Sequence, residues 1–247
     1  VGAAGSPYGR SLDWSALSGR GYPDSVLVTN NTVLNLELGV GGSRKMGGSL
    51  NIDAGSEATM VGMTDTLVVL KNVTVNGILR LGSSIGSDLK LGGNYTQGAA
   101  GFTFNNNRAV IFNGTGNQLV TKVGGGIIFI DYFVVDKPTG DVKLTTNTNA
   151  YITAPVNNAS SLRVLQLIRG DSGMNDGIIT VEGDGLNSII VLVDNGPTAR
   201  RIYTSTGTGE FRIIGTNTGF GVTKFTIVSQ NSGKLLFDNN VEVSTTV

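Results

Sequence analysis

The sequence predicts an all-β protein, and within that class it favours a parallel β-solenoid. Three observations lead to this prediction. Short runs rich in Val, Ile, Leu and Thr recur along the whole chain. Gly, Asn, Asp and Ser separate these runs, as they do in proteins built from many short strands. Helix signals are scarce, because Gly interrupts nearly every window in which apolar residues could recur with helical spacing.

The predicted strands follow one another from the first tenth of the chain to its end. Before residue 150 they are Val26–Val28, Val33–Leu38, Ser49–Ile52, Thr66–Leu70, Val73–Val75, Ile78–Leu81, Leu89–Leu91, Phe102–Phe104, Ala109–Phe112, Ile127–Ile130, Tyr132–Val135 and Val142–Thr145. After it they are Ile178–Val181, Ile189–Val193, Phe211–Ile214, Lys224–Val228, Lys234–Phe237 and Val241–Val243.

Two all-β architectures fit these strands, a parallel β-solenoid and an antiparallel β-sandwich. Asn76-Gly77 suits the tight turn of a hairpin, so Val73–Leu81 can be interpreted as one hairpin. The same dipeptide also suits a solenoid corner. Internal similarity favours the solenoid. Asn31–Gly39 resembles Asn72–Gly82 about 42 residues later, and prominent strands recur roughly every 20 residues, as stacked coils do. The sandwich remains the alternative.

We expect one elongated solenoid domain over residues 1–247, in which residues 1–24 form an N-terminal extension or an assembly arm. The longest apolar stretch, Ile127–Val135, is interrupted by Asp131. It is shorter than the ~20 residues of a membrane-spanning helix, so no membrane span is predicted. The sequence begins at Val1 without a charged and then apolar leader, which favours a secreted chain whose signal peptide has been removed.

The composition excludes several classes of function. The chain contains no His and no Cys. Zinc fingers, haem ligation by His or Cys, disulfides, thiol nucleophiles and Ser-His-Asp triads are therefore ruled out. The 18 basic and 18 acidic side chains cancel, so the sequence carries no electrostatic footprint for nucleic acid. Only 15% of the residues are charged, which is low for a soluble domain. We expect no enzymatic activity.

Four acidic residues in a Gly-rich stretch are the candidate metal ligands, namely Asp171, Asp176, Glu182 and Asp184. Carboxylate oxygens suit Ca²⁺, and calcium is the one cofactor that the sequence suggests. The four residues lack the spacing of an EF-hand loop and of the calcium-binding nonapeptide repeat. A solvated acidic loop is therefore the alternative interpretation.

Two further patterns admit both a functional and a structural interpretation. Gly82–Gly86 has the form G-x-S-x-G, which would make Ser84 a nucleophile. Because the chain offers no His as base, we interpret this segment as a corner. Phe129, Tyr132 and Phe133 lie in one predicted strand pair, where they would form either a sugar-stacking surface or part of the core.

Six segments of low sequence complexity combine short apolar stretches with turn-forming or small polar residues. They are Tyr22–Val28, Gly48–Gly55, Gly93–Gln97, Phe102–Phe104, Ala109–Gln118 and Phe133–Leu144. Together they resemble the repetitive β-solenoid regions of large secreted and cell-surface proteins of Bacteroidota and related bacteria. The resemblance covers roughly residues 20–150. It implies export, display at the cell surface and adhesion, and it supplies no catalytic residues.

These observations predict an extracellular structural protein, a self-assembling subunit of a surface filament, sheath or adhesive fibre. The expected partners are copies of the same chain, because low charge weakens repulsion between strand edges and open edges template association. A carbohydrate-binding adhesin module that recognises surface glycans is the alternative. A polysaccharide-degrading β-helix enzyme is a more remote one.

Overall fold

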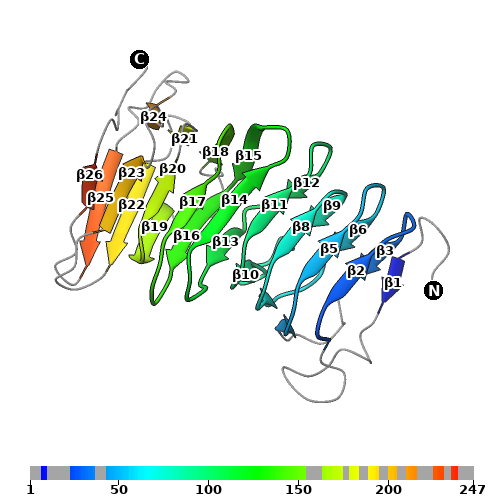
Figure 1. The fold of residues 1–247 in the computed structure, drawn as a ribbon. Helices are drawn as coiled ribbons and strands as arrows, with labels where there is room; N and C mark the ends of the chain where they lie inside the picture. The colour runs from blue at the N-terminus through cyan, green and yellow to red at the C-terminus, as the bar shows by residue number, and fades with distance from the viewer. Residues whose placement is uncertain are drawn as a thin grey trace. The chain divides into compact units, whose positions relative to one another are not determined.

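The computed structural model describes the backbone of residues 7–9, 23–36, 43–153, 163–174, 178–183, 189–194, 200–204, 210–215, 225–230 and 235–238. Within these residues every regular element is a β-strand, and the strands of successive coils pair in parallel (Figure 1). The predicted parallel β-solenoid is therefore confirmed, and the antiparallel sandwich is excluded.

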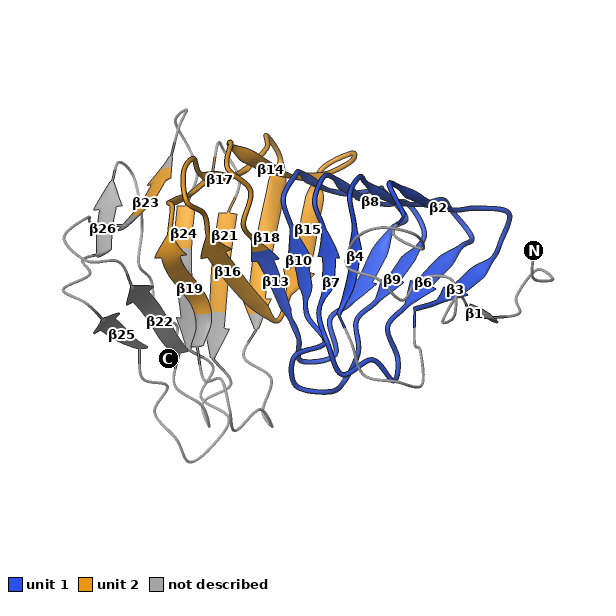
Figure 2. Ribbon diagram, turned by 90° about the horizontal axis from the view of Figure 1, so that it is seen from below, with its two compact units in different colours: residues 1–111 blue, residues 112–247 orange. Residues whose placement is uncertain are grey.

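The chain divides into two compact units, Val1–Ile111 and Phe112–Val247 (Figure 2). Strand β13 (Ala109–Phe112) spans the division. A single domain over residues 1–247 stays a prediction. So does an arm over residues 1–24, of which the structure describes the short strand β1 (Pro7–Gly9) and residues 23 and 24. Strand β1 pairs in parallel with the strand that begins at Val33.

Unit 1 consists of three stacks of parallel strands, to which each full coil contributes one strand apiece. The first stack holds β1, β3 (Val33–Asn35), β6 (Glu57–Thr59), β9 (Ile78–Arg80) and β12 (Phe102–Phe104). The second holds β2 (Val26–Val28), β5 (Leu50–Ile52), β8 (Val73–Val75) and β11 (Tyr95–Gln97). The third holds β4 (Arg44–Met46), β7 (Leu67–Val69) and β10 (Leu89–Leu91).

The core of unit 1 follows from the two-residue period of these strands. In β5 the side chains of Leu50 and Ile52 are fully buried, while Asn51 between them faces outward. Leu50 lies in register with Val73 of the next coil, and Val73 lies in register with Tyr95 of the coil after that. Equivalent inward positions therefore stack on one another, and each coil covers the apolar edge of its neighbour.

The dipeptide Asn76-Gly77 forms a corner rather than a hairpin. Strands β8 and β9 on either side of it belong to different stacks. The Gly77 N–H donates to the Ile52 carbonyl of the preceding coil at 3.0 Å. A Cβ on Gly77 would lie 2.2 Å from the Ser56 carbonyl oxygen, so this close approach of two corners requires glycine.

Unit 2 also contains three stacks. The first holds β14 (Gln118–Lys122), β17 (Val142–Leu144), β20 (Ser172–Met174), β23 (Arg200–Thr204) and β26 (Leu235–Asp238). The second holds β16 (Tyr132–Asp136), β19 (Arg163–Arg169), β22 (Ile189–Asp194) and β25 (Phe225–Gln230). The third holds β15 (Gly126–Ile130), β18 (Thr148–Thr153), β21 (Ile178–Gly183) and β24 (Glu210–Gly215).

Coil length differs between the two units. In unit 1 a side chain and the backbone group it meets in a neighbouring coil are separated by 20 to 25 residues. In unit 2 the separation reaches 30 residues between Asp171 and Arg201. Most described strands of unit 2 are also longer: β19 spans 7 residues, although β17 and β20 span 3 each.

The two segments aligned by internal similarity do not occupy equivalent positions in their coils, so this alignment is wrong. It superimposes Asn31–Gly39 on Asn72–Gly82, yet β3 and β8 belong to different stacks. Val33 of β3 lies in register with Glu57. The true step between Leu67 and Leu89, which do lie in register, matches the recurrence of prominent strands. The fold was therefore predicted correctly from a repeat that was misaligned.

Candidate functional site

Strand β12 is inverted with respect to the hydrophobicity of its residues. Phe102 and Phe104 face outward and are 40% and 37% exposed, whereas Thr103 between them is buried. Elsewhere in unit 1, strands such as β5 and β8 direct their apolar residues inward. Because side chains alternate across a strand, a shift of one residue would bury both rings. The exposed phenylalanines are therefore a specific feature of this coil.

A buried polar network compensates for the inward threonine. The hydroxyls of Tyr95 and Thr103 lie 2.6 Å apart, and the Gln97 Nε2 group donates to the Gly101 carbonyl at 2.7 Å. The Tyr95 hydroxyl also lies 3.5 Å from Gln97 Oε1. Burial raises the pKa of Tyr95 to about 12, and the hydrogen bond to Thr103 partly opposes that rise. The Tyr95 and Thr103 hydroxyls thus each have a hydrogen-bond partner, which offsets the free-energy cost of burying Thr103 instead of a phenylalanine.

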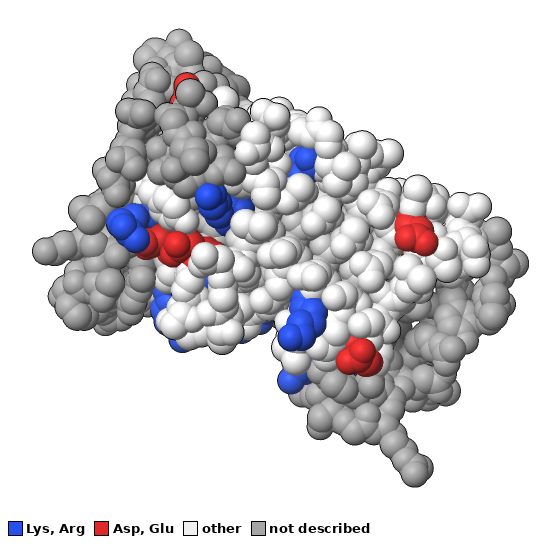
Figure 3. Space-filling view, viewed as in Figure 1, with Lys and Arg blue, Asp and Glu red and all other residues white. Residues whose placement is uncertain are grey.

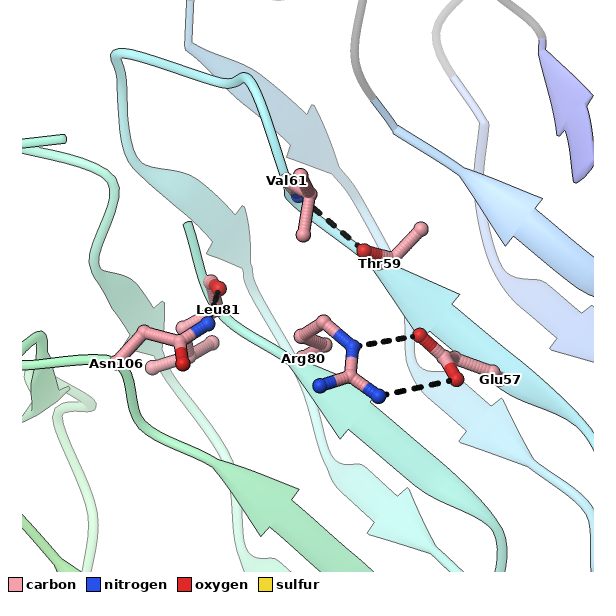
Figure 4. A network of polar contacts seen from close by, with 6 residues as sticks. All are labelled: Glu57, Thr59, Val61, Arg80, Leu81 and Asn106. Atoms are coloured by element: carbon pink, nitrogen blue, oxygen red, sulfur yellow. Dashed lines mark hydrogen bonds and ion pairs between the residues drawn. The ribbon is translucent and has the colours of Figure 1, made fainter. Parts of the chain in front are cut away.

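Outside, the two rings join a row of contacts that crosses three coils. The Phe102 and Phe104 rings meet edge to face, with centroids 4.7 Å apart. The Arg80 guanidinium lies over the Phe104 ring, 4.1 Å from its centroid. On its other side Arg80 Nε donates to Glu57 Oε1 at 2.9 Å, and Nη2 approaches Oε2 at 3.5 Å (Figure 4).

We call this surface the Phe102 face; it comprises Glu57, Ile78, Arg80, Phe102 and Phe104. Its side chains occupy the outward positions of β6, β9 and β12, and Glu57, Ile78 and Phe102 share one register row. We predicted Phe102–Phe104 as a strand from the sequence, but its pattern does not indicate that the phenylalanines face solvent. The other three residues were missed.

Side chain to backbone bonds hold the chain around this face (Figure 4). Asn106 follows β12 with φ of 50°, and its Nδ2 donates to the Leu81 carbonyl of the preceding coil at 2.5 Å. The Val61 N–H donates to Thr59 Oγ1 at 3.2 Å in the turn after β6. Left-handed backbone is tolerated best by Asn among non-glycine residues, so Asn106 suits this corner.

Figure 3 shows that the described surface on one side of the molecule is largely uncharged, with charged groups scattered among uncharged side chains. On the Phe102 face Arg80 and Glu57 neutralise each other. That face therefore presents aromatic rings beside a balanced ion pair.

A second recurring feature is a ladder of polar side chains at one corner of unit 1. Ser25 Oγ accepts a hydrogen bond from the Ser49 N–H at 3.0 Å, and Ser49 Oγ accepts one from the Asn72 N–H at 3.3 Å. Asn72 Oδ1 accepts one from the Asn94 N–H at 2.8 Å. Each of these residues directly precedes a strand of the second stack. We call this arrangement the corner ladder.

Unit 2 contains a corner ladder of the same kind. Asn117 Oδ1 accepts a hydrogen bond from the Asp141 N–H at 3.1 Å, and Asp171 Oδ1 accepts one from the Arg201 N–H at 2.9 Å. Arg201 Nε also donates to Asp171 Oδ2 at 2.9 Å. Asp171, the first of the candidate calcium ligands, is thus occupied by the backbone and side chain of the next coil.

The structure does not describe the side chains of the other three candidate calcium ligands. Asp176 and Asp184 lie outside the described residues, and for Glu182 only the backbone in β21 is described. Among the side chains that the structure describes, no group of three or more acidic residues is placed to hold a metal ion. The calcium site therefore stays a prediction.

The outward face of β23 carries an aromatic ring that lies flat on its neighbour. A Cβ on Gly173 would lie 2.4 Å from Cζ of Tyr203, so the ring covers this glycine. The Tyr203 hydroxyl reaches back to donate to Asp141 Oδ2 at 3.2 Å. Burial raises the pKa of Tyr203, and the nearby Asp141 carboxylate raises it further.

A buried lysine closes another corner of unit 2. Lys137 is fully buried, and its Nζ donates to the carbonyls of Gly114 and Gly116 at 2.9 and 2.7 Å and to Gln118 Oε1 at 2.6 Å. Burial lowers the pKa of Lys137 to about 8, and Asp141 opposes that shift. Three acceptors around one ammonium group satisfy a charge that would otherwise be costly to bury.

The three aromatic residues expected to act together are separated by the structure. Phe129 on β15 is exposed, and its ring lies 5.6 Å from that of Tyr151 on β18. Tyr132 and Phe133 are buried, and Phe133 packs against Phe112 with centroids 5.0 Å apart. The sugar-stacking interpretation is therefore open for Phe129, while the core interpretation is correct for the other two.

Ser84 lies in the turn between β9 and β10, and its carbonyl accepts a hydrogen bond from the Ser87 N–H at 3.1 Å. A strand rather than a helix follows this turn, so Gly82–Gly86 is the corner that we expected.

Comparison with protein-family models, curated proteins and solved structures finds no match to this chain. The resemblance to Bacteroidota surface proteins therefore stays a prediction. No helix long and apolar enough to cross a membrane occurs in the part of the chain that the structure describes.

Proposed function

We propose that this chain is an extracellular structural protein, a β-solenoid subunit of a surface filament, sheath or fibre that associates with copies of itself. The observation that carries the proposal is the corner ladder. Ser49 and Asn72 use their polar groups to join one coil to the next rather than to line a cavity. A chain that connects successive coils at each step resists local opening, which suits a structural role.

The charged side chains support the same role. Glu57 pairs with Arg80, Asp136 with Arg169 and Asp171 with Arg201, and in each pair the partners come from successive coils. These carboxylates are engaged as cross-links, so the proposal assigns them no catalytic role.

Exposed apolar residues on outward faces support self-association. Leu27 on β2 is 61% exposed, and Ile127 and Phe129 on β15 are 43% and 47% exposed. The zero net charge of the chain removes long-range repulsion between copies.

Negative-stain electron microscopy of the purified chain over a range of concentrations tests this proposal. We expect filaments or ordered clusters whose number grows with concentration, together with a rising mass in light scattering. A strictly monodisperse monomer at high concentration would contradict self-association. Surface labelling of intact source cells tests the extracellular location, and labelling only after lysis would contradict it.

The enzyme alternative is tested separately by release of unsaturated uronides from acidic polysaccharides, with and without Ca²⁺. We expect no release under either condition. Calcium-dependent release would overturn the non-enzymatic proposal and would direct attention to Asp171, Asp176, Glu182 and Asp184.

A further inference from the structure

We propose that the Phe102 face binds a segment of a neutral polysaccharide by packing a sugar ring against the exposed parts of Phe102 and Phe104, beside the Arg80 guanidinium that lies over Phe104. This inference goes beyond a structural role and does not depend on self-association. It rests on the orientation of β12, on the chemistry of the face and on its size.

The orientation of β12 is the first argument. A strand that followed hydrophobicity alone would bury both rings, because removing their apolar surface from water is favourable. Instead Thr103 occupies the inward position, where Tyr95 satisfies its hydroxyl. Exposed large apolar residues above a buried polar one mark a surface kept for contact with something else.

The chemistry of the face fits a sugar. Pyranose rings offer C–H groups that pack on an aromatic face and hydroxyls at their edges that need hydrogen-bond partners. Arg80 carries five N–H donors, of which those on Nε and Nη2 face Glu57, so further donors remain for hydroxyls. The Glu57 oxygens retain lone pairs that can accept from hydroxyls.

The charge of the face selects among glycans. Arg80 and Glu57 form a pair whose side chains are 30% and 20% exposed, so the face carries no net charge. An acidic polysaccharide would bring carboxylates toward Glu57 without a spare cation to meet them. A neutral chain meets no such penalty.

The size of the face distinguishes a glycan from a second copy of the chain. A stable protein interface buries about 800 Å² on each partner, with some 20 residues. The Phe102 face offers two partly exposed rings with one aliphatic side chain and one ion pair. A patch of two rings, one aliphatic side chain and one ion pair suits contact with one or two sugar units rather than with a second protein chain.

The face is also preorganised. Arg80 is held between Glu57 and Phe104, and the Phe102 and Phe104 rings brace each other. Binding therefore requires little further ordering of side chains, which lowers its entropic cost.

Affinity electrophoresis in gels containing hydroxyethyl cellulose, galactomannan or dextran tests the inference, with polygalacturonate as the acidic comparison. We expect at least one neutral polysaccharide to retard the chain, and the double variant Phe102→Ser/Phe104→Ser to lose about tenfold or more of that affinity, as loss of an aromatic anchor does. Ile85→Ser is the matched control, because Ile85 is 70% exposed in the turn before β10 and lies off the face. It should bind as the original chain does.

Arg80→Gln is the second variant, and it should weaken binding while leaving both rings in place. Thermal unfolding of each variant verifies that the solenoid is intact. Three results would overturn the inference: no retardation by any of the three neutral polysaccharides, undiminished binding by the folded double variant, or a loss of oligomeric mass in that variant without any glycan binding. The last result would assign the face to a second copy, as the proposed structural role allows.

Discussion

The hydroxyl groups of Tyr95 and Thr103 lie 2.6 Å apart in the interior of the coil formed by β10, β11 and β12. This contact joins the inward side of β12 to the neighbouring strand in the same coil. It sets which residues of β12 face solvent, because Thr103 can remain inside only while its hydroxyl has a partner.

The contact predicts a non-additive double-mutant cycle. Tyr95→Phe and Thr103→Val should each lower the free energy of unfolding by about 1–2 kcal/mol, because each leaves one buried hydroxyl without its partner. The double variant should lose less than the sum of the two, since it removes both hydroxyls together. Urea denaturation of the four proteins measures the cycle. Strict additivity would show that the two hydroxyls do not interact.

Tyr95 also predicts a loss of stability at alkaline pH. Its pKa in the fold is raised to about 12 from 10, so the unfolded chain releases its proton first. The contribution of Tyr95 is fully present below pH 10 and is lost as the pH rises from 10 to 12, by about 2–3 kcal/mol. We expect the difference in unfolding free energy between the original chain and Tyr95→Phe to shrink over this interval and to change sign near its upper end. A difference independent of pH would contradict the burial of this phenol.

Lys137 predicts the opposite dependence at a lower pH. Its pKa in the fold is lowered from 10.5 to about 8, so between these values the unfolded chain binds more protons than the folded one. The contribution of Lys137 to stability therefore rises as the pH increases from 8 to 10.5.

Substitution by Lys137→Met should cost about 2–4 kcal/mol, because the carbonyls of Gly114 and Gly116 lose the ammonium group that donates to them. Gln118 Oε1 loses one donor and keeps the Gly114 N–H at 2.8 Å. The substitution should also remove the rise in stability between pH 8 and 10.5. Lys143→Met, on the outward side of β17, is the control and should do neither. Equal effects of the two substitutions in guanidinium denaturation would contradict the buried position of Lys137.

The corner ladder predicts a graded response at Asn72. Asn72→Ala should lower the free energy of unfolding by about 0.5–1 kcal/mol, because the Asn94 N–H loses its acceptor. Asn72→Ser should retain part of this stability, since Ser49 performs the same task one coil earlier. Lys71→Ala, at the adjacent exposed position, is the control. If all three variants unfold at the same urea concentration as the original chain, the ladder contributes nothing.

Most strands could be predicted from the sequence because their residues are apolar and β-branched, as in β8 and β22. Nine of the described strands were missed: β1, β4, β6 and β11 in unit 1, and β14, β18, β19, β20 and β23 in unit 2. Three of those in unit 1 are polar in composition. They are β4 (Arg44–Met46), β6 (Glu57–Thr59) and β11 (Tyr95–Gln97). In β4, Arg44 is buried at the position that Leu67 holds in the next coil. Pairing with neighbouring strands, rather than intrinsic preference, places such segments in the sheet.

The Phe102 face could not be predicted for a different reason. Alternation in Phe102-Thr103-Phe104 places both rings on one side of a strand, but it does not say which side faces inward. That choice depends on Tyr95, which lies in another strand of the coil. The corner ladder could not be predicted from the sequence either, because its residues are common in turns and their spacing changes from 22 to 30 residues along the chain.

Thiol accessibility along β12 tests the central claim most directly, because the chain contains no cysteine and a single introduced thiol reports on one position. The variants are Phe102→Cys, Thr103→Cys and Phe104→Cys, each treated with a maleimide reagent under native conditions and again in urea. We expect the thiols at 102 and 104 to react in the fold nearly as fast as in urea. The thiol at 103 should react at least about 100-fold more slowly, as buried groups do when reaction requires opening. Rapid labelling at 103 with protection at 102 and 104 would show that the phenylalanines belong to the core, and both the orientation of β12 and the Phe102 face would then be wrong.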